Sequence, residues 1–327
     1  MKLLVTGSAG HLGEALVRSF RGDGHDVLGM DLVESPYTSV VGSITDPEAV
    51  RRCMAGVDAV LHSATLHKPH VVTHGMQAFI DSNITGTLIL LEAAVAAGVQ
   101  TLLFTSTTSV FGDAMRPAPA DPAVWVTEGL LPAPRNIYGV TKLAAEGLCR
   151  LFHRKHGLNC PVLRTSRFFP EEDDDAGVRG AYADDNVKVN EYLHRRVDIE
   201  DVVSAHCCAL ERASTIGFDR FIVSATTPFQ AGDAAELRHH AHRVVARYVP
   251  EFEAVYARLG WKMFPDIGRV YVNEKARRIL GWSPRHDFRS VVQRLADGHD
   301  SRSALALQIG RKGYHERVFD DRPFPVE

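Results

Sequence analysis

Residues 6–13 read Thr6-Gly7-Ser8-Ala9-Gly10-His11-Leu12-Gly13, and they directly follow a short apolar segment that begins at Leu3. Three glycines at this spacing permit a tight turn and let the backbone approach a pyrophosphate closely. The helix expected after the turn points its N-terminal amide groups at the same anion. The stretch therefore predicts a strand, turn and helix that bind a dinucleotide, with contacts from Gly7, Gly10, His11, Leu12 and Gly13.

A carboxylate follows at the end of the second expected strand. Asp31 lies 18 residues beyond Gly13 and comes directly after the β-rich segment 26–30. At this position a carboxylate accepts hydrogen bonds from both hydroxyls of the adenosine ribose and repels a 2′-phosphate. Residues 32–35 bring no cation that would receive such a phosphate. The predicted cofactor is therefore NAD.

Short β-rich segments alternate with helical patterns through the first half of the chain. This alternation indicates repeated β-α units and a parallel sheet. The clearest helical pattern spans Gly75 to Ala97 and ends before Gly98. We predict an α/β fold with a doubly wound parallel sheet of the Rossmann type. Its strands are expected at residues 3–6, 26–30, 39–41, 59–62, 101–105, 160–164 and 220–224.

The pattern changes after about residue 165, where the acidic run 171–175 indicates a solvated loop or lid. We assign residues 1–165 to the NAD-binding Rossmann domain, completed by about 196–226. Residues 166–195 and 227–327 would form a smaller, discontinuous α/β substrate domain. Later helices are expected at residues 200–212, 234–248, 251–259, 273–280 and 288–297.

The composition excludes several classes of protein. Of the 327 residues, 45% are hydrophobic and 24% are charged, as in ordinary globular domains. The formal charge of -3 provides no field that would attract nucleic acid or anionic lipid. No apolar run approaches the roughly 20 residues of a membrane-spanning helix, and no targeting segment is visible. We expect a cytoplasmic protein with no nucleic-acid or membrane partner.

No metal site is expected. The five cysteines show no Cys-x-x-Cys spacing, so neither a disulfide framework nor a cysteine zinc site is indicated. His67, His70 and His74 would share one face of a helix, but no carboxylate or cysteine accompanies them locally.

Tyr138 and Lys142 lie four residues apart, which places a phenol and an ammonium on one helix face. Hydride chemistry at a secondary alcohol needs a base for the hydroxyl proton, and tyrosine with its ordinary pKa near 10 is a weak base at pH 7. A lysine at this spacing favours the phenolate. The hydroxyl-rich segment 105–109 lies upstream, at a strand end where parallel sheets bind ligands.

In this combination the sequence resembles the extended short-chain dehydrogenase/reductase family, which includes nucleotide-sugar epimerases and dehydratases. The resemblance covers most of the chain and rests on the glycine motif, Asp31, His62-Ser63-Ala64, Asn83-Ile84-Thr85-Gly86-Thr87, the hydroxyl cluster, Tyr138 with Lys142, and Leu280-Gly281-Trp282-Ser283-Pro284. It implies that Tyr138 is the acid/base, that Lys142 binds the nicotinamide ribose and tunes Tyr138, and that Thr107 hydrogen-bonds the reacting oxygen. It also adds cofactor contacts at Ser43, Ile44, Ala64 and Thr65.

The catalytic groups leave the net reaction open. The 4,6-dehydratases of this family carry Thr-Asp-Glu, whereas Thr107 is followed here by Thr108 and Ser109, so the resemblance disfavours dehydration. The leading expectation is a nucleotide-sugar epimerase of the UDP-glucose 4-epimerase type. A net NAD-dependent dehydrogenase of a free sugar, uronate or other small alcohol needs the same residues. A non-catalytic NAD-binding regulator is the third possibility.

The substrate region departs from the family pattern. Arg167 stands where the family usually has Asn, and only about thirty residues separate it from Arg195 and Arg196, which is short for a nucleotide-diphosphate pocket. An arginine fork suits a phosphate or a carboxylate, although the same arginines could pair with the acidic run. The expected substrate contacts are His67, Asn83, Thr108, Arg167 and Arg196. Family members often dimerise through the helices corresponding to 75–97 and 138–156, so a homodimer is expected.

Overall fold

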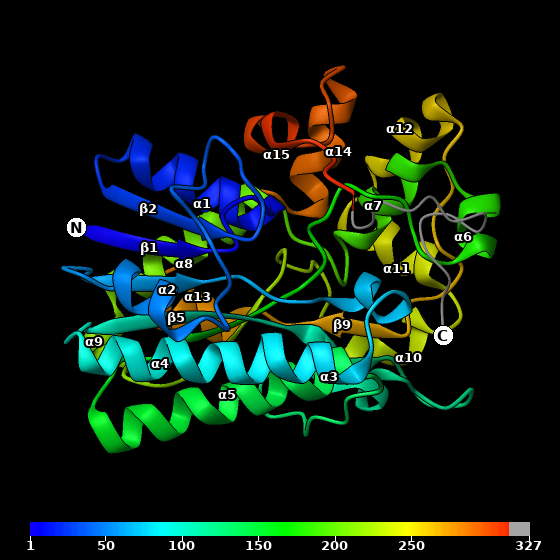
Figure 1. Ribbon diagram of the computed structural model, residues 1–327. Coiled ribbons are helices and arrows are strands. Elements are labelled where there is room, and N and C mark those ends of the chain that lie inside the picture. The colour runs from blue at the N-terminus through cyan, green and yellow to red at the C-terminus, as the bar shows by residue number, and fades with distance from the viewer. Residues whose placement is uncertain (314–327) are drawn as a thin grey trace.

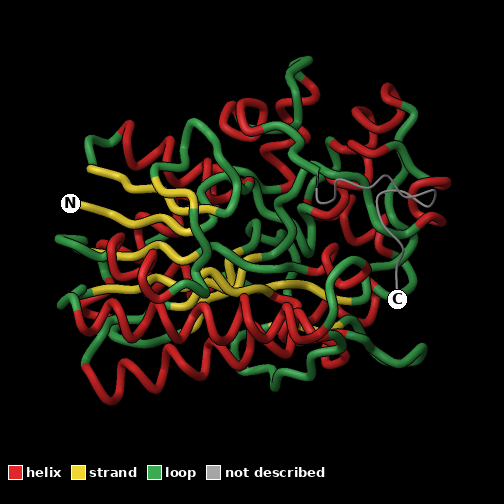
Figure 2. The backbone as a smooth tube through the Cα atoms, in the orientation of Figure 1, coloured by secondary structure: helices red, strands yellow, loops and turns green. Residues whose placement is uncertain are grey.

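The computed structural model describes residues 1–313 of the chain and has a seven-stranded parallel sheet at its centre (Figures 1 and 2). The strand order is β3-β2-β1-β4-β5-β7-β8, so the chain winds outward from β1 in both directions. This reversal creates the switch point at which such sheets bind ligands. The strands are β1 (Lys2–Thr6), β2 (Asp26–Asp31), β3 (Val40–Val41), β4 (Ala59–His62), β5 (Thr101–Thr107), β7 (Val162–Thr165) and β8 (Arg220–Val223).

The doubly wound parallel sheet predicted from the sequence is confirmed. Several strand ends differ from the prediction by one or two residues; for example, β3 is one residue shorter, and β5 continues through Thr107 instead of ending at Thr105. The extension of β5 matters for the site because Thr107 pairs with Thr165 of β7 and is therefore held by the sheet.

Helices cover both faces of the sheet because successive side chains of a strand point to opposite sides. Leu3 and Val5 of β1 belong to one core and Leu4 to the other. The first core is covered by α1 (His11–Gly22) and α8 (Ile199–Glu211), and the second by α2 (Pro47–Cys53), α4 (Gly86–Ala96) and α5 (Ile137–His156).

Two late helices also belong to the first core. Leu280 of α13 (Glu274–Leu280) and Ile309 of α15 (Ala304–Ile309) pack into it, and so does Trp282. Leu280, Trp282 and Ile309 fall within the range 227–327 that we expect to form the second domain, but their side chains are buried in the same core as those of α1 and α8.

The expected helix at 75–97 is divided into three pieces. They are α3 (Met76–Phe79), the π-helix η2 (Ile80–Thr85) and α4. Contrary to the sequence-based expectation, Met76–Ala96 is long and apolar enough to cross a membrane by length and composition alone. The core helix of a soluble protein passes the same test, and Leu90 and Leu91 are buried against the sheet here.

The remaining described chain gathers around a third core that contains Phe252, Tyr256 and Phe288. A two-stranded parallel sheet joins β6 (Val124–Val126) to β9 (Arg269–Tyr271) at this end of the molecule. The expected helix 234–248 is interrupted at residues 238–240.

The other elements are η1 (Lys68–Val72), η3 (Thr108–Met115), α6 (Ala176–Ala181), α7 (Asp184–Glu191), α9 (Ala213–Ile216), η4 (Ala231–Asp233), α10 (Ala234–Leu237), α11 (Ala241–Tyr248), α12 (Phe252–Leu259) and α14 (Phe288–Ala296).

Candidate active site

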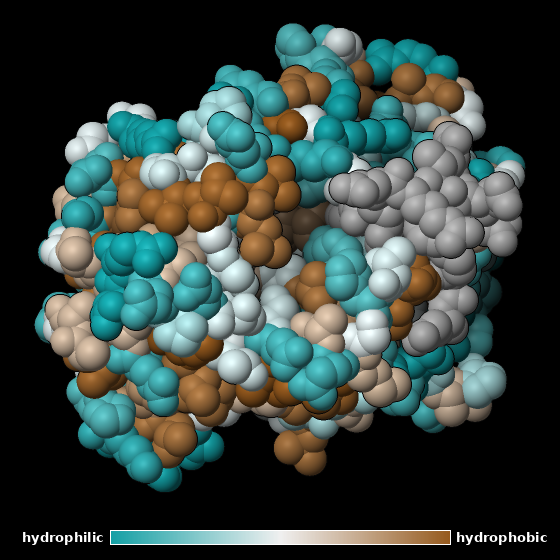
Figure 3. All heavy atoms as spheres, in the orientation of Figure 1, coloured by the Kyte–Doolittle hydropathy of each residue, from teal (hydrophilic) through white to brown (hydrophobic). Residues whose placement is uncertain are grey.

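A cleft of about 660 Å³ lies at the C-terminal ends of the central strands. Its walls come from the segments after β1, β2, β4, β5 and β7 and from Tyr138 at the start of α5. Figure 3 shows the surface hollowed beside an apolar region over β2 and the segment after it, where Leu32 and Val33 are exposed. Most of the predicted site residues line this cleft. Lys142, Asn83 and Arg196 are buried outside its lining.

The glycine loop leaves no room for side chains at its critical positions. A Cβ atom at Gly13 would lie 1.8 Å from the carbonyl oxygen of Gly7, and one at Gly7 would lie 2.8 Å from the amide nitrogen of Ala64. Gly7 also has a φ of 76°, a left-handed conformation that favours glycine. The packed loop places Gly10, His11 and Leu12 at the cleft, where α1 begins. This cradle fits a pyrophosphate.

Asp31 faces the same loop from the end of β2. Its Oδ2 accepts a hydrogen bond from the amide of Ala9 (2.9 Å), and its Oδ1 accepts one from the amide of Val33 (3.0 Å). These bonds fix the carboxylate at the rim of the cleft, where it fits the hydroxyls of an adenosine ribose. Ser43 and Ile44 line the cleft nearby.

Tyr138 and Thr107 meet where β5 ends beside α5. Thr107 Oγ1 accepts a hydrogen bond from the amide of Ser109 (3.1 Å). Its hydroxyl also acts on the Tyr138 hydroxyl and lowers the pKa of that phenol. Burial raises the pKa of Tyr138 to about 12, and the bond from Thr107 opposes that rise because it favours the phenolate. The side chain of Asn136 caps α5 by accepting from the amide of Gly139 (3.0 Å), and this cap fixes the helix start that carries Tyr138.

Lys142 lies one turn beyond Tyr138 and is 2% exposed. Its Nζ sits 4.1 Å from the centroid of the Phe104 ring. Burial lowers the pKa of Lys142 to about 7, and the carboxylate of Glu146 partly restores it. The ammonium is therefore poised to lose or gain its proton near neutral pH.

A hydrogen-bonded chain with a single direction runs behind the cleft. Thr87 Oγ1 donates to the carbonyl of Asn83 (2.7 Å), so His62 must donate to Thr87 through Nε2 (3.0 Å). His62 Nδ1 then accepts from Thr6 (2.8 Å), whose oxygen accepts from the amide of Ala64 (3.3 Å). Burial, aided by Lys142, lowers the pKa of His62 to about 3, so its ring stays neutral. The chain ties β1, β4 and α4 together beneath the cofactor side of the cleft.

Asn83, an expected substrate contact, is 2% exposed and uses its amide inside the protein. Its Oδ1 accepts from the amide of Leu66 (2.9 Å) and from Thr65 Oγ1 (2.9 Å). Its Nδ2 donates to the carbonyl of Leu66 (2.9 Å) and to Thr141 Oγ1 (3.0 Å). Asn83 thus joins the loop after β4 to α5, and it sits in the π-helical turn, a conformation that is frequent at functional sites.

A buried ion pair supports the strand end that carries Thr107. Glu146, fully buried in α5, receives Arg164 from β7 in a two-point contact (2.9 and 2.7 Å). The same carboxylate accepts from Ser106 Oγ (2.6 Å) and from Arg220 Nε (2.9 Å). Sequence reasoning missed this network because its four members come from four separate elements.

The arginines at the substrate end contact carboxylates. Arg167 Nη1 lies 2.8 Å from Asp173, and Arg195 Nη2 lies 2.8 Å from Glu191. Arg196 is buried and donates to Glu191 (2.8 Å) and to the carbonyl of Phe169 (3.1 Å). The pairing with the acidic run that the sequence left open is therefore present for Arg167, which still lines the cleft.

Arg269 and Tyr271 of β9 also line the cleft. Nothing local in the sequence marks them, because contacts with distant segments hold β9 at the site: its pairing with β6 and the hydrogen bond from the Tyr271 amide to the carbonyl of His194 (3.0 Å). Thr108 lines the cleft as expected, and so does His67, whose ring stacks on Phe169 with centroids 5.3 Å apart.

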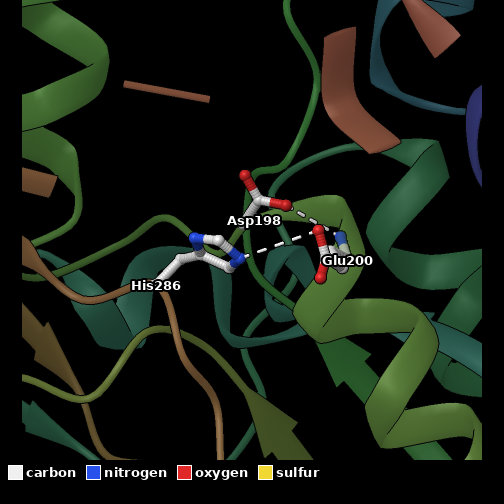
Figure 4. A group of neighbouring side chains, drawn as sticks. All are labelled: Asp198, Glu200 and His286. Atoms are coloured by element: carbon white, nitrogen blue, oxygen red, sulfur yellow. Dashed lines mark hydrogen bonds and ion pairs between the residues drawn. The ribbon is translucent and has the colours of Figure 1, made fainter. Parts of the chain in front are cut away.

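A second group of polar side chains lies away from the cleft. Ligand atoms of Asp198, Glu200 and His286 lie within 4.8 Å of one another (Figure 4). Asp198 Oδ1 accepts a hydrogen bond from Ser303 Oγ (2.6 Å), and Glu200 pairs with Arg285. Protein donors thus already hold both carboxylates, and the group joins α8 to the segments before α14 and α15.

A model of the NAD dependent epimerase/dehydratase family matches residues 3–222. The chain belongs to this family. It is accordingly an NAD-dependent enzyme of the extended short-chain dehydrogenase/reductase type, and the prediction of NAD as cofactor is confirmed.

Curated relatives share the family but differ in what they are named for. The chain is 25% identical to a UDP-glucose 4-epimerase of Streptomyces lividans, over 98% of this chain and 99% of that protein. It is 33% identical to an L-arabinose 1-dehydrogenase of Haloferax volcanii, over 50% of this chain and 65% of that protein. It is 32% identical to the uncharacterized protein y4nG of Sinorhizobium fredii, over 49% of this chain but only 39% of that protein's length.

Among solved structures, the fold is similar to a short-chain dehydrogenase/reductase superfamily protein of Agrobacterium tumefaciens with bound NAD. The TM-score is 0.66 at 24% identity, and the match covers 91% of this chain and 96% of that one. At this identity the likeness shows the fold alone.

Proposed function

We propose that this epimerase/dehydratase family member transfers a hydride at a secondary alcohol of a sugar, with Tyr138 as the acid/base. The observation that carries this proposal is that Thr107 and Tyr138 line the same cleft, one helical turn from the buried Lys142. NAD, when bound, supplies the hydride acceptor.

Each residue then has a distinct task. Tyr138 takes the proton from the reacting hydroxyl. When substrate is bound, Thr107 turns its one hydrogen from Tyr138 to the substrate oxygen that gains negative charge. The positive charge of Lys142 favours the phenolate of Tyr138. Burial lowers the pKa of Lys142, and a partner that binds the ammonium would raise that pKa again. The Glu146 network holds Ser106 and thereby the strand end that carries Thr107.

The cofactor contacts follow the shape of the cleft. Gly7, Gly10, His11, Leu12 and Gly13 would hold the pyrophosphate. Asp31 would bind the adenosine ribose, with Ser43 and Ile44 beside the adenine. Ala64, Thr65, Tyr138 and Lys142 would surround the nicotinamide half. All except Lys142 line the cleft.

Epimerisation is the reaction we place first, since the Streptomyces lividans 4-epimerase aligns along nearly the whole chain. Removal and return of hydrogen at one carbon need only Tyr138, Lys142 and Thr107. Net dehydrogenation is the second candidate, and the compact cleft favours it because a small sugar fits beside the cofactor more readily than a nucleotide sugar. Thr108 and Ser109 supply no carboxyl groups for an elimination.

The test is Tyr138→Phe, assayed with nucleotide sugars and free sugars in the presence and absence of added NAD. Turnover should fall by roughly 10²–10⁴-fold, the usual contribution of a general acid/base, while NAD content after denaturation stays unchanged. Tyr248→Phe, in the third core and remote from the cleft, is the control. An isomeric sugar without net NADH indicates an epimerase, and NADH in proportion to substrate indicates a dehydrogenase. Full turnover in Tyr138→Phe would refute the proposed role.

We also propose a homodimer that forms through α4 and α5, which lie side by side along one edge of the molecule (Figure 1). Apolar side chains are exposed on α5 and on α3, which precedes α4: Val140 on α5 is 47% exposed, and Met76 at the start of α3 is 72% exposed. The cytoplasmic location remains a prediction.

A further inference from the structure

We propose that two segments beside the cleft, residues 169–174 and residues 311–313, form a clasp that closes over NAD and controls its exchange. The inference goes beyond the proposed function, because it concerns the retention of the cofactor and holds for epimerisation and for dehydrogenation alike. It rests on contacts that join these two segments to each other and to loops on the opposite side of the cleft.

The acidic run, which the sequence marks as a solvated loop or a lid, crosses the cleft. It follows β7, which lies three positions from β1 in the sheet, a distance of roughly 14 Å at about 4.8 Å between neighbouring strands. Even so, Glu171 Oε1 lies 2.9 Å from Nε2 of His11 in the turn after β1, and the two side chains are only 9% and 6% exposed. The run therefore passes across the ends of β4 and β5, where the cleft lies.

Contacts at both ends of the first segment attach it to loops that line the cleft. The Phe169 ring packs edge-on against His11 of the glycine turn (centroids 5.4 Å apart) and stacks on His67 of the loop after β4 (5.3 Å). Lys68, the next residue of that loop, forms an ion pair with Asp174. The segment is thus held against the turn after β1 and the loop after β4 at once.

The second segment holds the first in place. The backbone amides of Lys312 and Gly313 donate to Glu171 Oε1 (3.2 and 3.3 Å). Lys312 Nζ donates to Oε2 of Glu14 in the first turn of α1 (2.5 Å). The buried carboxylate of Glu171 therefore connects the glycine turn, the acidic run and the second segment of the clasp.

The closed clasp leaves the cleft open beneath it. Glu172, Asp174, Lys312 and Gly313 line the cleft, which has a volume of about 660 Å³ with these contacts formed. NAD held at the glycine turn therefore has to pass the clasp on entry and on exit. Each passage breaks contacts of Glu171, so the strength of those contacts sets how fast the cofactor exchanges.

The experiment follows the release of NADH from the loaded full-length protein by fluorescence, after an excess of NAD is added and without any sugar. Glu171→Ala should release NADH about 10- to 100-fold faster than the wild type, the range expected for the loss of a charged hydrogen bond. Lys312→Met removes the anchor on α1, should act in the same direction, and decides the question if Glu171→Ala does not fold. The control is Glu253→Ala, which removes an exposed histidine and glutamate pair between α11 and α12 (3.5 Å) and should leave release unchanged.

Hydrogen exchange gives a second measurement. The amides of Lys312 and Gly313 open to solvent only when the clasp opens locally. They should therefore exchange more slowly in the NAD-loaded wild type than in the free protein, because bound NAD adds contacts beneath the closed clasp. Glu171→Ala should remove this protection.

The outcomes bear on the clasp separately from the reaction. Equal release rates in the wild type, Glu171→Ala and Lys312→Met would overturn the proposal. Slower association with unchanged release would also overturn it, because Glu171 would then shape the open cleft instead of closing it. Amide exchange that is the same with and without NAD would count against closure. A failure to turn over any sugar would count against the proposed function alone, since release is measured without substrate.

Discussion

The hydroxyl of Thr107 has one hydrogen to donate, and its oxygen accepts a bond from the amide of Ser109 (3.1 Å). The same hydroxyl lowers the pKa of Tyr138, because a hydrogen bond donated to the phenol oxygen favours the phenolate. One methyl-bearing side chain at a strand end therefore influences the protonation of the group proposed as acid/base.

Thr107→Ala should raise the pKa of Tyr138 further above its ordinary value, since a bond that favours the phenolate is lost. The acidic limb of the turnover profile should then move to higher pH. Turnover at pH 7 should fall by roughly 10²–10³-fold, as on removal of one oxyanion donor. Thr107→Ser keeps the hydroxyl and should behave as the wild type. Profiles of kcat against pH for the three proteins provide the measurement, and an unmoved limb in Thr107→Ala would contradict the assignment.

Lys142 should make the stability of the NAD-free protein depend on pH. Its pKa falls from an ordinary value of 10.5 to about 7 in the fold, so between these values the unfolded chain binds more protons. The contribution of Lys142 to the free energy of unfolding therefore rises from pH 7 to about 10.5, and its full cost is present below pH 7. Lys142→Met should stabilise the protein more at pH 6 than at pH 10 in urea unfolding. Lys155→Met, exposed on the same helix, should show no such difference.

At the scale of elements, the turn between β1 and α1 requires glycines because there is no room for a Cβ atom at Gly7 and Gly13. A Cβ at Gly13 would lie 1.8 Å from a backbone oxygen, whereas one at Gly147, on the exposed side of α5, would meet nothing within 4 Å. Gly13→Ala should therefore abolish NAD retention and lower Tm. Gly147→Ala should stabilise by about 0.5–1 kcal/mol, because alanine is the better helix former. Thermal unfolding and NAD content measure both effects; NAD retained by Gly13→Ala would contradict the packing described.

These elements also mark what a sequence can predict. The glycine turn and the Tyr138 and Lys142 pair could be predicted from the sequence because both are defined by spacings of three and four residues. The π-helical break in the helix at 76–96 could not be predicted in this way. Its role depends on the hydrogen bond of Asn83 with Leu66, which lies 17 positions away. The place of Arg269 in the cleft could not be predicted for the same reason, because most of the cleft comes from residues 7–195, more than 70 positions earlier in the chain.

For the whole molecule, the exposed apolar side chains of α3 and α5, Met76 and Val140, favour self-association. Val140→Glu should convert a dimer into a monomer, because a charge would have to be buried at a helix contact. Leu131→Glu alters an even more exposed residue (81%) that lies outside these helices and should leave the dimer intact. Light scattering after size-exclusion chromatography measures the mass, and a monomeric wild type at micromolar concentration would count against the interface.

The first core of the sheet is completed from the far end of the chain. Leu3 and Val5 share it with Leu280, Trp282 and Ile309, and the Trp282 indole donates to Ser204 Oγ (2.9 Å). During synthesis β1 leaves the ribosome first. The rest of this core is translated later, at about 5–20 residues per second. The strand that carries the glycine turn cannot complete its own core until Leu280, Trp282 and Ile309 have been synthesised. We therefore expect this enzyme to depend on protection of a nascent, apolar N-terminal segment, and a ribosome stalled before residue 280 should display a chain that proteases still cut.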